Sequence, residues 1–135
     1  MKKVIISFIL IVLLIFACQS KNRETTTKHI VPNNYNGVTV WLIKKGLTLA
    51  KRSNDTILVE YSDVGYFESG DISVSFNDKT EHYYQNGEKI TFIRDTTFGS
   101  FQNGRYYSNI ITKIENFHMN IKHKQDSLIR AVINR

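Results

Sequence analysis

The fold of this chain is indicated most clearly by the stretch Glu81-His-Tyr-Tyr-Gln-Asn-Gly-Glu-Lys-Ile-Thr-Phe-Ile93. Two runs rich in aromatic and β-branched residues flank Asn86-Gly87, and both of these residues accept the positive φ angles of a type I′ turn. We therefore predict a tight two-residue hairpin at this point. In that register Tyr83 faces Ile90 across the two strands.

Short β-rich segments precede the hairpin, with turn residues between them. The predicted strands cover residues 38–43, 47–50, 56–61 and 71–76, and residues 64–67 form either a bend or a short edge strand. The strand 71–76 alternates most strictly, with Ile72, Val74 and Phe76 separated by serines, as is typical of a half-buried antiparallel strand. The predicted fold class is mainly β, with a small antiparallel β-sandwich or partly open barrel over residues 35–101.

The segment 102–135 has a different period. Its apolar residues recur at intervals of three and four, which predicts a C-terminal amphipathic helix that packs on the β domain and makes the fold α+β. The apolar stripe consists of Tyr107, Ile110, Ile114, Phe117, Ile121, Leu128 and Val132. Residues 106–114 also have the composition of a last strand, in which case the helix begins as late as Glu115. A coiled-coil contact or a membrane surface are the alternative uses of the apolar stripe.

The N-terminal segment 1–17 has the parts of a secretory signal peptide, with Lys2 and Lys3 ahead of an apolar run and Ala17 at its end. The run over residues 4–16 is short for a membrane span, which needs about 20 apolar residues. Ile15-Phe16-Ala17-Cys18 resembles the lipobox of bacterial lipoproteins, although Phe16 is bulkier than the residue usual there. The resemblance implies that Cys18, the only cysteine, carries the lipid. An ordinary cleaved signal peptide or an uncleaved anchor are the alternatives.

Residues 18–34 are predicted to form a lipidated tether. They are mostly polar and have no period, so we expect disorder. Removal of Lys2 and Lys3 from the 18 lysines and arginines leaves 16 against 12 acids. That balance favours anionic surfaces such as lipid headgroups or acidic glycans.

A second resemblance covers about residues 30–93. Ile30-Val-Pro-Asn-Asn-Tyr-Asn-Gly37, Gly65 and the paired Tyr83-Tyr84 before Asn86-Gly87 resemble a family of small exported bacterial proteins that opens with an I-P-x-x-Y-x-G-like motif. The family has no assigned activity. The chain is also similar, more loosely, to prealbumin-type sandwich modules, which implies display or binding.

Metal and cofactor chemistry is not indicated. His118 and His123 lie five residues apart, or about 140° around a helix, so they cannot share a metal as an i,i+4 pair does. His82 lies beside Glu81 in a predicted strand, where we expect a polar cross-strand contact. The remaining histidine is His29. We expect no cofactor, no metal ligand and no catalytic residue.

Carboxylates and aromatic residues leave two other kinds of site open. Two of the acids Asp63, Glu68, Asp71, Asp78 and Glu81 could meet for glycoside hydrolysis, but their spacing does not require it. Aromatic residues interleave with lysine and arginine, as in nucleic-acid or sugar platforms. We expect the aromatic side chains to pack in the core, and we expect no nucleic-acid partner.

These observations predict a lipid-anchored, non-catalytic display or binding module of the bacterial cell envelope. It is held in the cell membrane or outer membrane by the lipid at Cys18, faces the periplasm or the surface, and binds a protein or a glycan. The alternative is an inhibitor or immunity lipoprotein against a periplasmic or surface hydrolase or toxin. An envelope hydrolase is the third hypothesis, and two acids meeting in a deep cleft would favour it.

Overall fold

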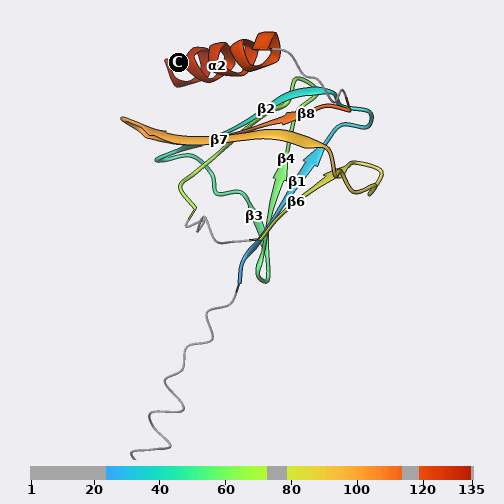
Figure 1. Ribbon diagram of the computed structural model, residues 1–135. Coiled ribbons are helices and arrows are strands. Elements are labelled where there is room, and N and C mark those ends of the chain that lie inside the picture. Colours follow the sequence, from blue (N-terminus) through green and yellow to red (C-terminus); the bar gives the residue numbers. More distant parts are fainter. Residues whose placement is uncertain (1–23, 73–78, 114–118, 135) are drawn as a thin grey trace, which may run out of the picture.

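The computed structural model describes residues 24–72, 79–113 and 119–134. Within them, eight strands form two four-stranded sheets, and one helix follows the last strand (Figure 1). The sheets face each other and do not close into a barrel, so the predicted mainly β, α+β fold class is confirmed. The elements are β1 Thr26–Val31, β2 Gly37–Lys44, β3 Lys51–Ser53, β4 Thr56–Glu60, β5 Tyr66–Ser69, β6 Lys79–Tyr84, β7 Ile93–Phe101, β8 Gly104–Ile111 and α2 Met119–Ile133.

Both sheets are mixed rather than antiparallel. Sheet A has the strand order β3-β4-β1-β6, and sheet B has the order β5-β2-β8-β7. Strand β1 runs parallel to β4 and β6, and β2 runs parallel to β5, whereas the other pairs are antiparallel. The predicted antiparallel pairing is therefore wrong for sheet A in particular. Successive strands β1 and β2 enter different sheets, so each finds its parallel neighbours through longer crossover connections.

The segment predicted as a disordered tether contains a strand of sheet A. In β1, Thr27, His29 and Val31 are buried, and the residues between them are half-buried. The strand lies between β4 and β6. The predicted tether boundary at residue 34 is therefore wrong, because the first described strand begins at Thr26. Threonine and histidine count as polar in a sequence pattern. The alternation of buried and half-buried residues in β1 was therefore not recognised in the sequence.

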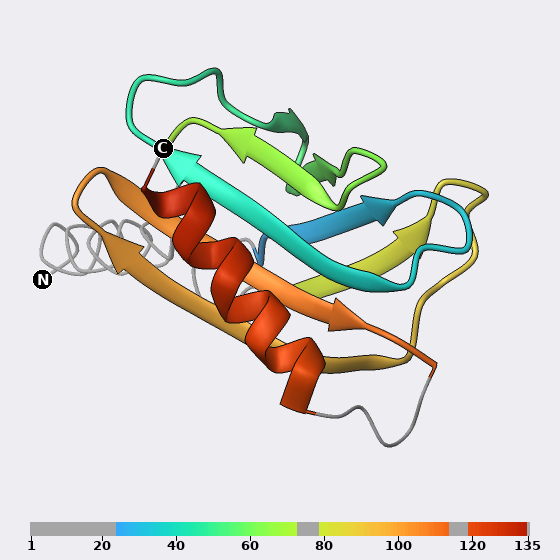
Figure 2. The same ribbon diagram turned by 90° about the horizontal axis from the view of Figure 1, so that it is seen from above.

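Helix α2 lies along the outer face of sheet B (Figure 2). It packs on β2 and β8, and its Ile129 and Val132 are buried there. The predicted packing of a C-terminal helix on the sheet agrees with this arrangement. Strand β8 takes residues 104–111, so the helix begins late, as the alternative boundary expected. Residues Ile114 and Phe117 of the predicted stripe lie outside the described residues.

Strand β2 is buried on both faces. Trp41 points into the space between the sheets, and Leu42 points toward α2. A continuous apolar run is typical of a strand covered on both sides. The predicted segments 38–43 and 56–61 correspond to β2 and β4. The segment 64–67 contains both of its alternatives, because the turn that includes residues 64–65 leads into the edge strand β5 at Tyr66.

Two other strand predictions have different outcomes. Residues 47–50 form no strand, and β3 begins only at Lys51. Most of the predicted strand 71–76 lies outside the described residues. Strand β7 was not predicted, because its half-buried and exposed positions alternate and both carry polar residues, so few apolar side chains mark a buried face.

The turn after β6 has three loop residues rather than two. The Tyr84 N–H donates to the Glu88 carbonyl, and the Gly87 N–H donates to the Tyr84 carbonyl, both over 2.9 Å. Gly87 has a φ of 88°, and Asn86 is not in the positive-φ region. This is the geometry of a three-residue loop with glycine in the left-handed position. The predicted type I′ turn is wrong, and Tyr83 pairs with Lys89 instead of Ile90.

Candidate functional site

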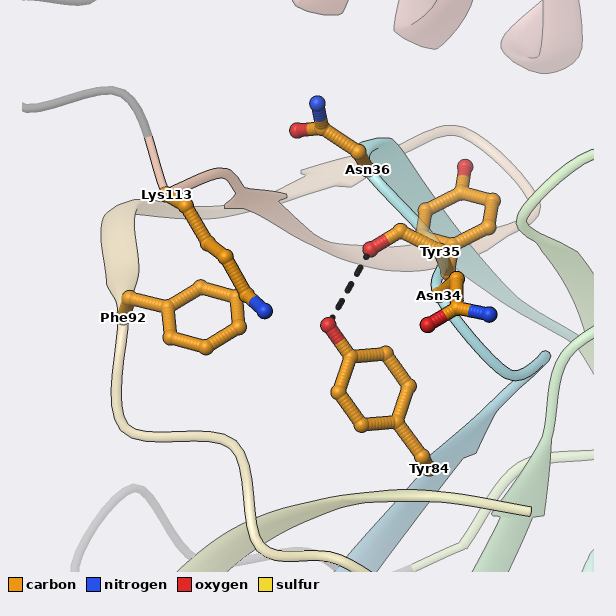
Figure 3. A pocket seen from close by; sticks show the side chains of 6 residues that line it. All are labelled: Asn34, Tyr35, Asn36, Tyr84, Phe92 and Lys113. Atoms are coloured by element: carbon orange, nitrogen blue, oxygen red, sulfur yellow. Dashed lines mark hydrogen bonds between the residues drawn. The ribbon is translucent and has the colours of Figure 1, made fainter. Parts of the chain in front are cut away.

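A pocket of about 170 Å³ opens at one end of the sandwich, where both sheets contribute to it (Figure 3). The loop after β1, the end of β6, the residue before β7 and the segment after β8 meet there. Because β7 and β8 are antiparallel, the start of one lies beside the end of the other. The lining residues are Asn34, Tyr35, Asn36, Tyr84, Phe92 and Lys113.

Hydrogen bonds fix the loop that supplies the amide side chains. The Tyr35 N–H donates to the Pro32 carbonyl over 3.1 Å and closes a turn. Asn34 has a φ of 61° in that turn, a conformation that asparagine tolerates better than most residues. The Asn33 side-chain oxygen accepts from the Asn86 N–H over 2.9 Å and ties the loop to the β6 turn. The rim of the pocket is therefore held at two points.

Tyr35 is locked by a glycine on a distant loop. Its hydroxyl donates to the Val38 carbonyl over 2.5 Å. A Cβ atom on Gly65 would lie 1.9 Å from the Tyr35 hydroxyl oxygen, and Gly65 also has a φ of 76°. Burial raises the pKa of Tyr35 to about 12, so the phenol stays neutral. The sequence motif that contains Tyr35 and Gly65 thus has a packing explanation.

The interior of the pocket offers binding groups of several kinds. The Lys113 Nζ lies 5.4 Å from the centroid of the Phe92 ring. Within the described chain, no carboxylate lies within ion-pair distance of Lys113. The Tyr84 hydroxyl donates to the Tyr35 carbonyl over 3.4 Å, as Figure 3 shows, and burial together with Glu88 raises the pKa of Tyr84. The pocket can therefore bind an anion and hydroxyl groups.

A second pocket, of about 260 Å³, lies at the opposite end of β2. Its Arg105 binds the Asp71 carboxylate over 2.9 Å and the Ile72 carbonyl over 2.6 Å. The Phe101 ring packs against the core under α2. The arginine and the ring of this pocket therefore already serve the fold.

Two of the histidines that were considered as metal ligands, His29 and His82, stack on each other between the sheets. His29 of β1 lies opposite His82 of β6, with the rings stacked at 4.5 Å between centroids. Tyr107 stacks on His29 at 5.1 Å, and the Tyr61 hydroxyl is hydrogen-bonded to the His29 Nδ1 over 2.9 Å. The exposed fractions are 1% for His29 and 4% for His82. Sequence reasoning missed this pair because it did not place β1 beside β6.

The environment of these histidines keeps them neutral. Burial, with the nearby His82, lowers the pKa of His29 well below its usual value, and burial lowers the pKa of His82 to about 4. No group of three His, Cys, Asp or Glu side chains suited to a metal occurs among the described residues. His123 is exposed on α2, and His118 lies outside the described residues. The pair is a packing layer in the core.

Among the described residues, the acids considered for glycoside chemistry either have basic partners or lie exposed. Hydrogen bonds from Lys79 and Tyr83 hold the pKa of Glu81 at about 2. Asp71 binds Arg105 at the second pocket. The remaining candidates are Asp63 and Glu68, which are exposed, and Asp78, which lies outside the described residues.

Aromatic residues occur both in the core and on the outer face of sheet A. Trp41, Tyr61 and Tyr107 pack between the sheets, as expected. Tyr83 is half-buried on the outer face, where Lys28 and Lys89 lie 5.6 Å and 5.9 Å from its ring centroid. This lysine and aromatic interleaving is a surface feature separate from the pocket.

No family model and no curated protein match this chain. Among solved structures, it is similar to a crystal structure at 2.75 Å named "Putative Lipoprotein from Bacillus anthracis". The sequence identity is 15% and the TM-score 0.51, over 82% of this chain and 96% of that one. The likeness shows a shared fold. Within the described residues, no helix has the length and apolar character needed to cross a membrane.

Proposed function

We propose that this chain is a lipid-anchored, non-catalytic binding module of the bacterial cell envelope. The segment 1–17 with Cys18 supports the anchor, and so does the name of the protein that shares the fold. The observation that carries the proposal is the position of the pocket, which lies at the opposite end of β1 from the point where the chain enters the fold. The chain enters the fold at Thr26, the start of β1, and the pocket loop follows the other end of that strand (Figure 1).

The length of chain between the anchor and the fold is short. Residues 19–25 separate Cys18 from Thr26, and they span at most about 25 Å when extended. Strand β1 then carries the chain about 17–20 Å further before the pocket loop begins. The domain is thus kept near its membrane with the pocket at the end of β1 away from the attachment point.

The chemistry of the described residues supports binding rather than catalysis. The pocket combines one ammonium, amides, a phenol and an aromatic ring, without an acid and a base that could share a proton. The two core histidines are buried and neutral, which removes them from general acid–base work at the surface.

The anchor is tested with Cys18→Ala in the bacterial host. We expect this variant to lose incorporation of a labelled fatty acid and to leave the detergent phase in phase partition. Each buried methylene of an acyl chain adds about 0.8 kcal/mol of membrane affinity, so removal of the chains is decisive. Ser20→Ala is the matched control, because it leaves the lipobox intact. A Cys18→Ala protein that is still labelled and still membrane-bound at high salt would refute the lipid anchor.

A further inference from the structure

We infer that the pocket between Asn34 and Lys113 binds an acidic pyranose, which is a sugar ring that carries a carboxylate, such as a hexuronate unit of an envelope glycan. The inference rests on the proposed function for the place where the ligand is met. The affinity itself depends only on the pocket. Of the two expected partners, a protein or a glycan, the pocket thus favours a glycan with acidic sugar units.

The charge of the ligand follows from Lys113. Some basic side chains of the described chain already have carboxylate partners: Lys79 and Lys89 bind Glu81, and Lys122 binds Asp95. The Lys113 Nζ lies 5.4 Å from the centroid of the Phe92 ring and lines the pocket. An ammonium that lacks a carboxylate partner in the described chain forms a charge-assisted hydrogen bond with an incoming anion.

The remaining lining groups favour a sugar over a simple anion. The half-buried Phe92 ring offers an apolar wall for the C–H face of a pyranose, as aromatic platforms do for other rings. Asn34 and Asn36 each offer an amide donor and an amide acceptor, which matches neighbouring hydroxyl groups. The Tyr84 hydroxyl has only a long bond of 3.4 Å, so it can turn to a ligand hydroxyl at little cost.

The size of the pocket limits the ligand to one ring. Its volume of about 170 Å³ is below the roughly 300–1,000 Å³ of sites that take drug-sized molecules. A free phosphate or acetate would use Lys113 and leave the ring and the amides idle. A carboxylated sugar also supplies hydroxyl groups and a C–H face for the amides and the ring, and its neighbours in a glycan can leave through the open side.

The test is an NMR titration of the mature lipidated chain in detergent micelles with three probes: glucuronate, glucose and acetate. We expect glucuronate to shift the amide signals of Asn34, Asn36 and Lys113. We also expect it to bind about tenfold more tightly than either glucose or acetate, since it alone supplies both the ring and the charge.

Two pocket variants and one control sharpen the test. Lys113→Met weakens glucuronate binding by about tenfold and leaves glucose binding unchanged, whereas Phe92→Leu weakens both sugars. Lys124→Met removes the same charge from the exposed face of α2 and leaves all binding unchanged.

Three results would overturn the inference. Acetate binding as tightly as glucuronate would reduce the pocket to an anion site. Glucose binding as tightly as glucuronate would remove the role of Lys113. Glucuronate binding without shifts at Asn34 and Asn36 would place the ligand elsewhere. The anchor is measured separately by fatty-acid labelling, so a failed pocket and a failed anchor give different results.

Discussion

Sheet B separates two cores that differ in chemistry. In the core between sheet B and α2, the buried apolar residues are all aliphatic, and Tyr66, Phe101 and Tyr106 pack against them partly buried; the buried residues are Val38, Val40, Leu42, Ile110, Ile129 and Val132. The core between the two sheets mixes aliphatic residues with aromatic and polar ones. Its buried polar residues include Thr27, His29, Thr39, His82 and Asn109. Sheet B thus faces the aliphatic core under α2 on one side. On its other side it faces the core between the sheets, which contains several buried polar residues and is called the half-polar core below.

The two cores also differ in how their buried polar groups are hydrogen-bonded. Under α2, the polar contact is a chain in which Gln125 donates to Ser108 over 3.0 Å and Ser108 donates to the Thr39 carbonyl over 2.8 Å. Between the sheets, Trp41 donates to Ser69 over 2.9 Å. Among the described residues, the buried side-chain atoms without a hydrogen-bond partner are Gln125 Oε1 under α2 and, between the sheets, Thr27 Oγ1, Thr39 Oγ1, His82 Nε2 and Asn109 Nδ2. An unpaired buried polar group costs about 1–3 kcal/mol. The core between the sheets therefore carries more of this desolvation cost than the core under α2.

The largest effect comes from neighbouring residues that point into opposite cores. Trp41 is 2% exposed and Leu42 is 0% exposed. Trp41→Ala should reduce the free energy of unfolding by about 3–5 kcal/mol and Leu42→Ala by about 2–5 kcal/mol. The Trp41→Ala substitution also removes the hydrogen bond that the indole N–H donates to the Ser69 hydroxyl. Urea denaturation of the mature chain measures both, and a loss below about 1 kcal/mol at either position would show that its core is not formed in solution.

The aliphatic core is tested from the helix side with Ile129→Ala. Ile129 is 6% exposed and packs on β2 and β8, so its truncation should cost about 2–4 kcal/mol and lower the melting temperature by several degrees. Arg130→Ala, on the exposed face of the same helix, is the control. An unchanged melting temperature at two protein concentrations would mean that α2 does not stabilise the sheet.

The half-polar core should respond to pH, whereas the aliphatic core should not. The folded pKa of His82, about 4, lies below the usual 6.5, so the unfolded chain takes up the proton first as the pH falls. Stability is therefore lost between about pH 6.5 and pH 4, and His82 alone removes about 2 kcal/mol between pH 7 and pH 5. His29 acts in the same direction. Glu81 does not interfere, because its low pKa affects stability only below about pH 4.5.

The measurement is the urea midpoint at pH 7 and pH 5 for the wild-type chain and for His82→Gln. The variant should lose about half as much stability on acidification, since one of the two buried histidines is gone. His123→Gln, at an exposed position, should behave like the wild type. If His82→Gln lost as much stability between pH 7 and pH 5 as the wild type, the two core histidines would not be the cause of the acid sensitivity.

The comparison also shows what the sequence could predict. The strands β2 and β4 and the helix packing were predictable, because aliphatic periodicity reports burial directly. Strand β1 was not, since its buried face is Thr27, His29 and Val31, and alternation says nothing about which strand pairs with which. The pocket has the same limit. Asn34 and Tyr84 stood in a recognisable motif, but Phe92 and Lys113 reach the pocket only through the pairing of β7 with β8.

The smallest effect is expected outside both cores, at glycines whose only constraint is the backbone. Gly46 and Gly87 have φ angles of 86° and 88°, and a Cβ atom at either would meet nothing within 4 Å. Gly46→Ala and Gly87→Ala should each cost about 1 kcal/mol, the strain of a left-handed alanine.

These two variants separate backbone strain from the support of the pocket rim. Gly87 follows Asn86, whose N–H holds the pocket loop through Asn33, whereas Gly46 lies in a turn at the other end of β2. A larger loss at Gly87 than at Gly46, measured by urea denaturation, would therefore report the strength of the tie between the β6 turn and the pocket loop. Equal losses would mean that the tie adds nothing to stability, and a loss near zero at both would contradict the left-handed turns themselves. In either of the first two cases the losses stay below those of Trp41→Ala and Leu42→Ala, because strain at an exposed turn removes no buried area from either core.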